Sequence, residues 1–341
     1  MNNLKIKGVH FCVFPETKLK FLEKCIRTCA GCGYTHIVLE FWGMLKYDCM
    51  KELGWDIAYS KEEVKSVIDI ARSLGMEIIP MFNHLGHAAQ SRGCSGKHVV
   101  LDQNPGLGHL FRSYGWEWDI EKNEVLDLLR QIRMELIGLC GDGKYFHLGC
   151  DEAYMFGTRE NASDILCDYI NGIQSELSKV GRRAIIWGDM LLAKSDFENE
   201  KYSYQANLKS PEASREALRK LDKKIIIADW QYDIFSGKWK SSAMFKKAGF
   251  DVLCCPWDNM ENARTAVDCA VDEELFGVIH TTWNTLYDGF RTMVYTGLLM
   301  NSEDRNAVIP KEVGFITSSI VRKMMPSGGK YEDAGWREHQ I

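Results

Sequence analysis

The sequence predicts a (β/α)8 barrel, and two observations support that fold class. From Ile6 onward, short apolar segments of strand character alternate with longer segments of helical character, eight times in one chain, as parallel βα units do. The length of 341 residues also suits a barrel with long loops. An open doubly wound sheet is disfavoured because no Gly-x-Gly-x-x-Gly follows the first strand.

The predicted strands are short apolar runs that end at polar or aromatic residues. In chain order they are residues 6–14, 35–41, 77–83, a short run from 145, 184–187, 224–230, 251–257 and 276–283. The predicted helices include residues 18–32, 61–74, 121–139, 211–221 and 290–300. Gly75 suits a helix C-cap, and Pro211 suits a first helical turn.

One domain is the simplest organisation, because no linker, solenoid repeat or low-complexity segment interrupts the series. We expect the barrel to span residues 1–301. Residues 302–341 are expected to form a peripheral extension packed on the barrel, with a helix at about 310–325.

The charge balance narrows the class of partner. The formal net charge of -5 gives no basic field, so nucleic acid and anionic membranes are not expected partners, and a neutral small molecule is favoured. No apolar run reaches the roughly 18 residues of a membrane span, and the start has no long apolar region. We therefore expect a soluble, cytoplasmic protein.

The twelve cysteines lie mostly within apolar runs and are expected to be small core residues rather than a disulfide framework. Cys25, Cys29 and Cys32 have the spacing of a radical-SAM iron–sulfur cluster. The same offsets place them on one helical face with Phe21 and Leu22, which favours a buried stripe over a cluster.

The segment Tyr145-Phe-His-Leu-Gly-Cys-Asp-Glu152 carries the strongest functional signal. Its apolar start predicts a strand, and its end presents two adjacent carboxylates. Neighbouring side chains on a regular strand point to opposite faces, so Asp151 and Glu152 can serve one substrate only beyond the strand terminus. The alternative is that the two acids simply open the next helix, where acids are favourable.

Acids and tryptophans follow most of the other predicted strands. Because barrel active sites lie at the carboxyl ends of the strands, these residues should gather at one rim: Glu40, Trp42, Asn83, His84, His87, Trp187, Asp189, Trp230, Tyr232, Asp233, Trp257, Asp258, Trp283 and Asn284. Indole faces with carboxylates complement the apolar faces and hydroxyls of a sugar. For any single tryptophan, core packing is the alternative.

The fourth-strand segment resembles the His-x-Gly-Gly-Asp-Glu signature of the family 20 glycoside hydrolases, the β-N-acetylhexosaminidases, with Cys150 in place of the second glycine. Asn83-His-Leu-Gly-His87 is similar to the Pro-Gly-His turn of that family. The chain is most similar to the short, single-barrel hexosaminidase D branch.

The resemblance implies an exo-acting β-N-acetylhexosaminidase in which the 2-acetamido group of the sugar is the nucleophile. Glu152 would be the acid, Asp151 would accept the acetamido N–H, and Tyr232 would hold the acetamido carbonyl. The expected substrate-binding residues are Trp187, Trp230, Trp283, Trp257, His87, Asn83 and Asp189, together with Glu40 and Asp288. The last two are candidate substitutes, because the first strand lacks the family's arginine and Thr285 stands where a glutamate is usual.

Two other functions remain open from the sequence. A non-catalytic sugar-binding barrel would keep the tryptophans without needing both acids. A metal-dependent barrel hydrolase would use histidines on or near strands: His10, His84, His87, His147 and His280. Neither His-x-His on the first strand nor His-Glu-x-x-His occurs, so we expect no metal ligand set and no cofactor. His87 and His147 are instead expected to orient the acids.

The longest irregular stretch is expected between His84 and Asp119. It is rich in glycine and carries Arg92, Trp116 and Trp118. Long structureless connections are usually functional, so a lid or wall of the pocket is predicted here.

Overall fold

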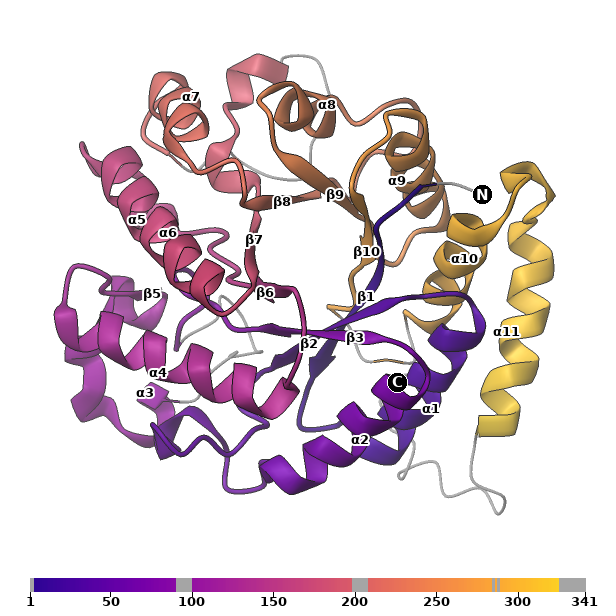
Figure 1. Ribbon diagram of the computed structural model, residues 1–341, viewed down its shortest axis with the longest axis horizontal. Coiled ribbons are helices and arrows are strands. Elements are labelled where there is room, and N and C mark those ends of the chain that lie inside the picture. The colour runs from indigo at the N-terminus through magenta and orange to yellow at the C-terminus, as the bar shows by residue number, and fades with distance from the viewer. Residues whose placement is uncertain (1–2, 90–99, 198–207, 284–285, 287–288, 325–341) are drawn as a thin grey trace.

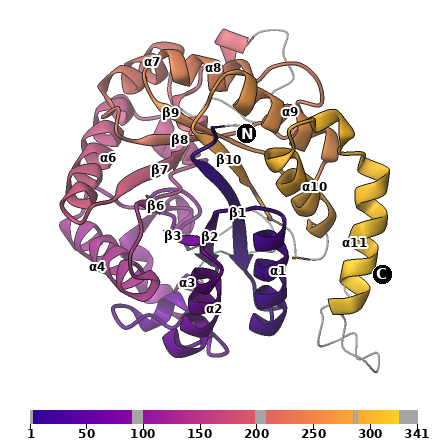
Figure 2. The same ribbon diagram turned by 45° about the vertical axis from the view of Figure 1, so that its right-hand side comes forward.

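The computed structural model describes residues 3–89, 100–197, 208–283, 286 and 289–324. Eight parallel strands form a closed barrel in the order β1-β10-β9-β8-β7-β6-β3-β2. The helices surround the strands on the outside (Figures 1 and 2). The predicted (β/α)8 fold is confirmed.

The barrel strands are almost entirely buried, as parallel strands covered by helices are. They are β1 Ile6–Val13, β2 His36–Phe41, β3 Glu77–Met81, β6 Tyr145–His147, β7 Arg183–Trp187, β8 Ile226–Trp230, β9 Asp251–Cys255 and β10 Gly277–His280. The predicted third, seventh and eighth strands ran two or three residues too far at their carboxyl ends. Those extra residues, 82–83, 256–257 and 281–283, belong to the loops at the rim.

The principal helices between the strands begin and end within about two residues of the predicted bounds wherever bounds were predicted. They are α1 Leu19–Gly31, α2 Lys61–Ser73, α4 Asn123–Cys140, α6 Ala162–Lys179, α7 Pro211–Lys220, α8 Lys240–Lys247, α9 Met260–Asp272 and α10 Phe290–Asn301. Ser60 and Glu63 form a capping box at α2, and Ser210 caps α7 ahead of Pro211. Cys25 and Cys29 lie in the buried stripe of α1, as expected.

The described part of the segment between β3 and α4 contains more regular structure than predicted. It contains α3 Val100–Gln103, a hairpin of β4 Phe111–Arg112 and β5 Glu117–Trp118, and 3-10 turns at Pro105–Leu110 and Ser113–Gly115. Trp118 is 1% exposed, packs on Phe111 and donates through Nε1 to the Asn83 carbonyl. Trp118 is therefore a core residue rather than part of a lid. Arg92 lies outside the described residues.

One further helix, α11 Pro310–Met324, follows the barrel and packs against α10 (Figure 2). Its Val313 is buried. Short elements complete the described chain: α5 Tyr154–Gly157 and 3-10 turns at Lys51–Leu53, Asp189–Leu191, Lys194–Phe197 and Arg305–Ala307. The division at residue 301 stays a prediction.

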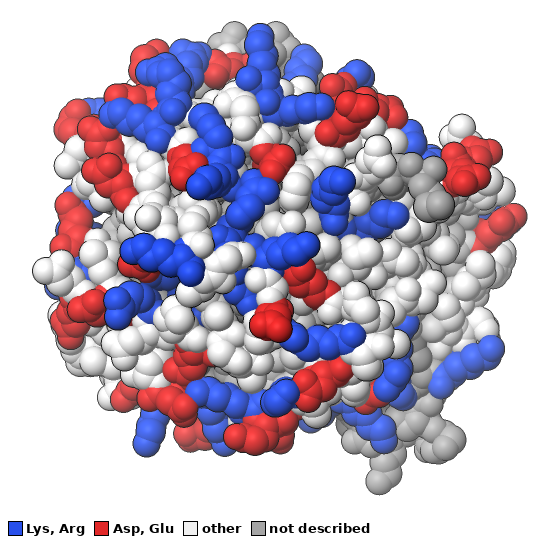
Figure 3. Space-filling model, in the orientation of Figure 1, with Lys and Arg blue, Asp and Glu red and all other residues white. Residues whose placement is uncertain are grey.

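The face of the molecule drawn in Figure 3 carries both basic and acidic side chains. Among the described helices, none is both long and apolar enough to cross a membrane.

Candidate active site

The loop that follows β6 has an unusual backbone. Gly149, Cys150 and Glu152 have φ angles of 67°, 69° and 49°. Non-glycine residues in this left-handed region cost roughly 1–2 kcal/mol each. The chain therefore leaves the strand after His147 and turns sharply, which frees the side chains of Asp151 and Glu152 from the strand's alternation. The acids lie beyond the strand terminus, as the sequence predicts.

The loop after β3 packs directly on this turn. A Cβ atom at Gly86 would lie 2.1 Å from the Asp151 carbonyl oxygen, and one at Gly149 would lie 2.2 Å from Asn83 Oδ1. The backbone N–H of His84 also donates to the Leu148 carbonyl at 2.9 Å. Only glycine allows this approach, so the two loops hold one another in place.

His87 lies between the two acids. Its Nε2 is 3.2 Å from Asp151 Oδ2 and 3.3 Å from Glu152 Oε2, and its ring lies 4.4 Å from the Trp116 ring. The side chain of Glu152 is 29% exposed, against 9% for Asp151. The placement fits the predicted orienting role of His87, and it leaves Glu152 as the more accessible acid.

The backbone of Glu152 is fixed from both sides. Its N–H donates to Asp189 Oδ2 at 2.9 Å, and its carbonyl accepts from Trp116 Nε1 at 2.7 Å. Burial, and then the charge of Asp151, hold the pKa of the Asp189 carboxyl well above its usual range. Asp189 is 1% exposed, so it supports the loop from below, while its predicted contact with substrate stays a prediction.

His147 supports the same turn from the end of β6. Its Nδ1 accepts the Gly149 N–H at 3.1 Å, and its ring lies 4.4 Å from that of Trp187. His147 therefore links the loop after β6 to the aromatic residues at the rim.

The predicted aromatic residues come together at the carboxyl ends of β7 to β10. The Trp283 ring is 5.7 Å from Trp187, and its Nε1 donates to the Tyr232 hydroxyl at 2.6 Å. Tyr232 stacks on Trp230 at 5.2 Å and lies 5.3 Å from Trp257. Burial raises the pKa of Tyr232 well above its usual value, so its hydroxyl keeps its proton and can donate one hydrogen bond.

Glu40 and Asn83 are buried, and their predicted contact with substrate stays a prediction. Asn83 Nδ2 donates to Glu40 Oε1 at 2.5 Å, and His10 Nε2 lies 2.9 Å from Glu40 Oε2. All three side chains are at most 1% exposed. The His10 ring is 4.6 Å from Trp283, so the group lies beside the aromatic residues. Asp288 and Thr285 lie outside the described residues.

Two aromatic residues at the site were not among the predicted substrate contacts. Trp42 follows β2 and lies 6.4 Å from Trp283. Trp116, from the turn before β5, contacts both His87 and the Glu152 backbone. The position of Trp42 at a strand end was a signal for it. Trp116 was signalled only as part of the stretch from His84 to Asp119 that was predicted to form a lid or wall of the pocket, and the hairpin that carries it was not predicted.

Carboxyl groups and gathered tryptophans at the carboxyl rim of a (β/α)8 barrel suit a carbohydrate substrate. The sequence model of one family, described as "Glycosyl hydrolase family 20, catalytic domain", matches residues 39–303. The chain belongs to glycosyl hydrolase family 20.

The similar proteins include hexosaminidase D of Bos taurus, 26% identical over 148 residues that make up 42% of this chain and 40% of that protein. A probable beta-hexosaminidase of Arthroderma benhamiae is 25% identical over 274 residues, 68% of this chain and 41% of that protein. The chain thus matches less than half the length of these curated relatives. In fold, it resembles the Flavobacterium johnsoniae chitobiase, with a TM-score of 0.65 at 14% identity over 95% of this chain and 52% of that one.

Proposed function

We propose that the chain is an exo-acting β-N-acetylhexosaminidase that removes terminal β-linked N-acetylglucosamine or N-acetylgalactosamine with retention of configuration. The observation that carries the proposal is the bridging of Asp151 and Glu152 by one histidine nitrogen, at 3.2 and 3.3 Å. Retaining enzymes with a carboxylate nucleophile place their two carboxyl groups on opposite sides of the scissile bond. Two neighbours that share His87 suit a route in which the substrate supplies its own nucleophile.

In that route the acetamido oxygen of the sugar attacks C1 while Glu152 gives its proton to the leaving glycosidic oxygen. Asp151 accepts the acetamido N–H and offsets the positive charge of the cyclic oxazolinium-type intermediate. The Tyr232 hydroxyl donates to the acetamido oxygen. Glu152, now a carboxylate, then takes a proton from the water that opens the ring, which restores the acid.

The aromatic residues support a sugar substrate of this size. Trp187, Trp230 and Trp283 would form the wall against the ring and the acetamido methyl, with Trp257 beside Tyr232. The names of the two curated relatives, a hexosaminidase and a probable beta-hexosaminidase, support the same substrate class. The neutral partner expected from the charge balance is consistent with it.

The test is hydrolysis of aryl β-N-acetylglucosaminide and β-N-acetylgalactosaminide beside the plain aryl β-glucoside, each assayed with and without EDTA. The proposal predicts turnover of one or both acetamido sugars and extremely slow reaction of the glucoside, because only the former carry the nucleophile. Activity that disappears with EDTA would point to a metal-dependent hydrolase. Binding of N-acetylglucosamine without turnover of either substrate would point to a non-catalytic sugar-binding barrel.

A further inference from the structure

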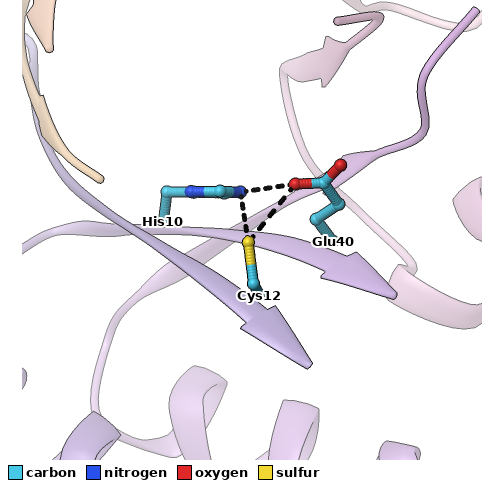
Figure 4. A group of neighbouring side chains, drawn as sticks. All are labelled: His10, Cys12 and Glu40. Carbon is cyan, nitrogen blue, oxygen red and sulfur yellow. Dashed lines mark hydrogen bonds and ion pairs between the residues drawn. The ribbon is translucent and has the colours of Figure 1, made fainter. Parts of the chain in front are cut away.

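Three side chains with different metal-binding donors, His10, Cys12 and Glu40, lie next to one another (Figure 4). His10 and Cys12 are two residues apart on β1, so they share one face of that strand. Glu40 on β2 pairs in register with Cys12. The His10 ring lies 6.4 Å from the ring of Trp187, the last residue of β7. Strand β7 lies across the barrel from β1, so this face of β1 points into the interior.

The distances among the three donor atoms approach those of a coordination shell. Cys12 Sγ is 3.6 Å from His10 Nε2 and 3.5 Å from Glu40 Oε2, and the latter two atoms are 2.9 Å apart. Tetrahedral zinc with ordinary Zn–S, Zn–N and Zn–O bonds would separate such donors by roughly 3.3 to 3.6 Å. The two distances from Cys12 Sγ match these values, and the distance from His10 Nε2 to Glu40 Oε2 must lengthen by a few tenths of an ångström.

We propose that His10, Cys12 and Glu40 form a binding site for Zn²⁺ or a chemically similar thiophilic divalent cation. The donor set of one imidazole, one thiolate and one carboxylate suits zinc, whereas Mg²⁺ and Ca²⁺ prefer oxygen ligands alone. Three protein ligands leave a fourth position for water or another oxygen. This site is separate from the acids Asp151 and Glu152, and it goes beyond the proposed hydrolysis.

Charge balance supports a divalent ion at this depth. The three side chains are at most 1% exposed, and a buried net charge is costly. A neutral His10, a Cys12 thiolate and a Glu40 carboxylate together offset a double positive charge. Metal ligation requires deprotonated thiol and imidazole donors, so affinity should fall as the pH falls.

Asn83 orients the carboxylate of Glu40. Asn83 Nδ2 donates to Glu40 Oε1 at 2.5 Å, which leaves Oε2 directed at His10 and Cys12. Asn83 is itself fixed, because Gly149 packs against its Oδ1 and its carbonyl accepts from Trp118 Nε1 at 3.0 Å. Partners of this kind orient metal-binding carboxylates and tune their affinity.

The experiment is a titration of the EDTA-stripped full chain with Co²⁺, followed by competition with Zn²⁺. The expected result is one ion per chain, with visible absorption of a tetrahedral ion and a thiolate-to-cobalt charge-transfer band. Cys12→Ser should abolish that band and weaken binding by about 100-fold or more. Loss of a residue that only supports a ligand already costs roughly 10- to 100-fold in affinity, and Cys12 is itself a ligand in this proposal. Cys140→Ser, a change at a buried cysteine of α4, should alter neither the band nor the affinity.

A band that survives Cys12→Ser but disappears in Cys29→Ser would place the ion on the α1 cysteines and overturn the proposal. The absence of a tight stoichiometric site in the wild-type chain would also overturn it. If Cys12→Ser does not fold, anomalous scattering from crystals of the wild-type chain grown with Zn²⁺ decides, by whether the peak lies between His10, Cys12 and Glu40. The readout is binding, so it stands or falls independently of hydrolysis.

Discussion

At the scale of single residues, the two neighbouring acids differ in exposure and surroundings. The side chain of Glu152 is 29% exposed and that of Asp151 is 9% exposed. Gly86 packs against the Asp151 carbonyl. A general acid must reach the leaving oxygen, whereas a charge-stabilising group works best when enclosed. This difference supports the assignment of Glu152 to the acid and Asp151 to the acetamido group.

We predict that Glu152→Gln lowers turnover of substrates with a poor leaving group by roughly two to four orders of magnitude. Aryl glycosides with a good leaving group should lose much less, because they need little protonation. The measurement is kcat/KM for both substrate types, with Glu160→Gln as a control on an exposed glutamate with 87% side-chain exposure. Equal losses on both substrates would exclude Glu152 as the acid.

The sequence could identify the candidate residues of the loop after β6 but not the geometry that relates them. Asp151, Glu152 and His87 stand in recognisable motifs, and the structure brings them within hydrogen-bonding reach. The pairing of Glu40 with His10 was not predicted. It depends on which residues of β1 and β2 lie opposite one another, and strand register is a property of the folded barrel.

At the scale of elements, the contact between the loops after β3 and β6 sets the position of both acids. A Cβ atom at Gly86 would lie 2.1 Å from a backbone carbonyl, which cannot rotate away as a side chain can. The two loops are therefore constrained to move together, and His87 follows Gly86 directly. Packing at this contact should matter for activity as well as for stability.

Gly86→Ala should destabilise the fold by about 1–3 kcal/mol, the cost of overpacking a tight site, and should lower kcat through displacement of Asp151 and His87. Urea unfolding and aryl-glycoside kinetics measure the two effects. Gly106→Ala is the matched control, because a Cβ there meets nothing within 4 Å. If kcat stayed unchanged in Gly86→Ala, the loop contact would not position the acids.

The sequence predicted the helices better than the strand ends. Helical periodicity and caps such as Ser60 with Glu63 mark helix limits locally. At the rim, aromatic and β-branched residues continue past the last ladder hydrogen bond, so residues 82–83 and 281–283 resembled strand. The β4–β5 hairpin escaped prediction because its strands have only two residues each, too short for a period to appear.

At the scale of the whole molecule, buried histidines link stability to pH. Burial, with the nearby charge of Lys144, lowers the pKa of His36 to about 4, although Glu77 lies 3.8 Å away. Burial, with the charge of His10, lowers the pKa of His280 to about 3. Below the ordinary value of 6.5 the unfolded chain binds more protons than the native one, so acid favours unfolding.

We therefore predict that the free energy of unfolding falls as the pH falls from about 6.5 towards about 4. His36→Gln should make this decline shallower, because one proton-linked group is removed. Urea unfolding at a series of pH values measures the slope, with His109→Gln as the control on a histidine whose side chain is 49% exposed. A slope unchanged in His36→Gln would contradict the role given to His36.

The central claim is that the substrate's acetamido group, rather than Asp151, is the nucleophile. The most direct test is the affinity for a stable thiazoline mimic of the cyclised intermediate, measured beside that for free N-acetylglucosamine. The account predicts that the thiazoline binds at least about 100-fold more tightly, as ligands resembling a transition state do. A covalent glycosyl adduct on Asp151, trapped with a 2-fluoro sugar and located by mass spectrometry, would contradict it.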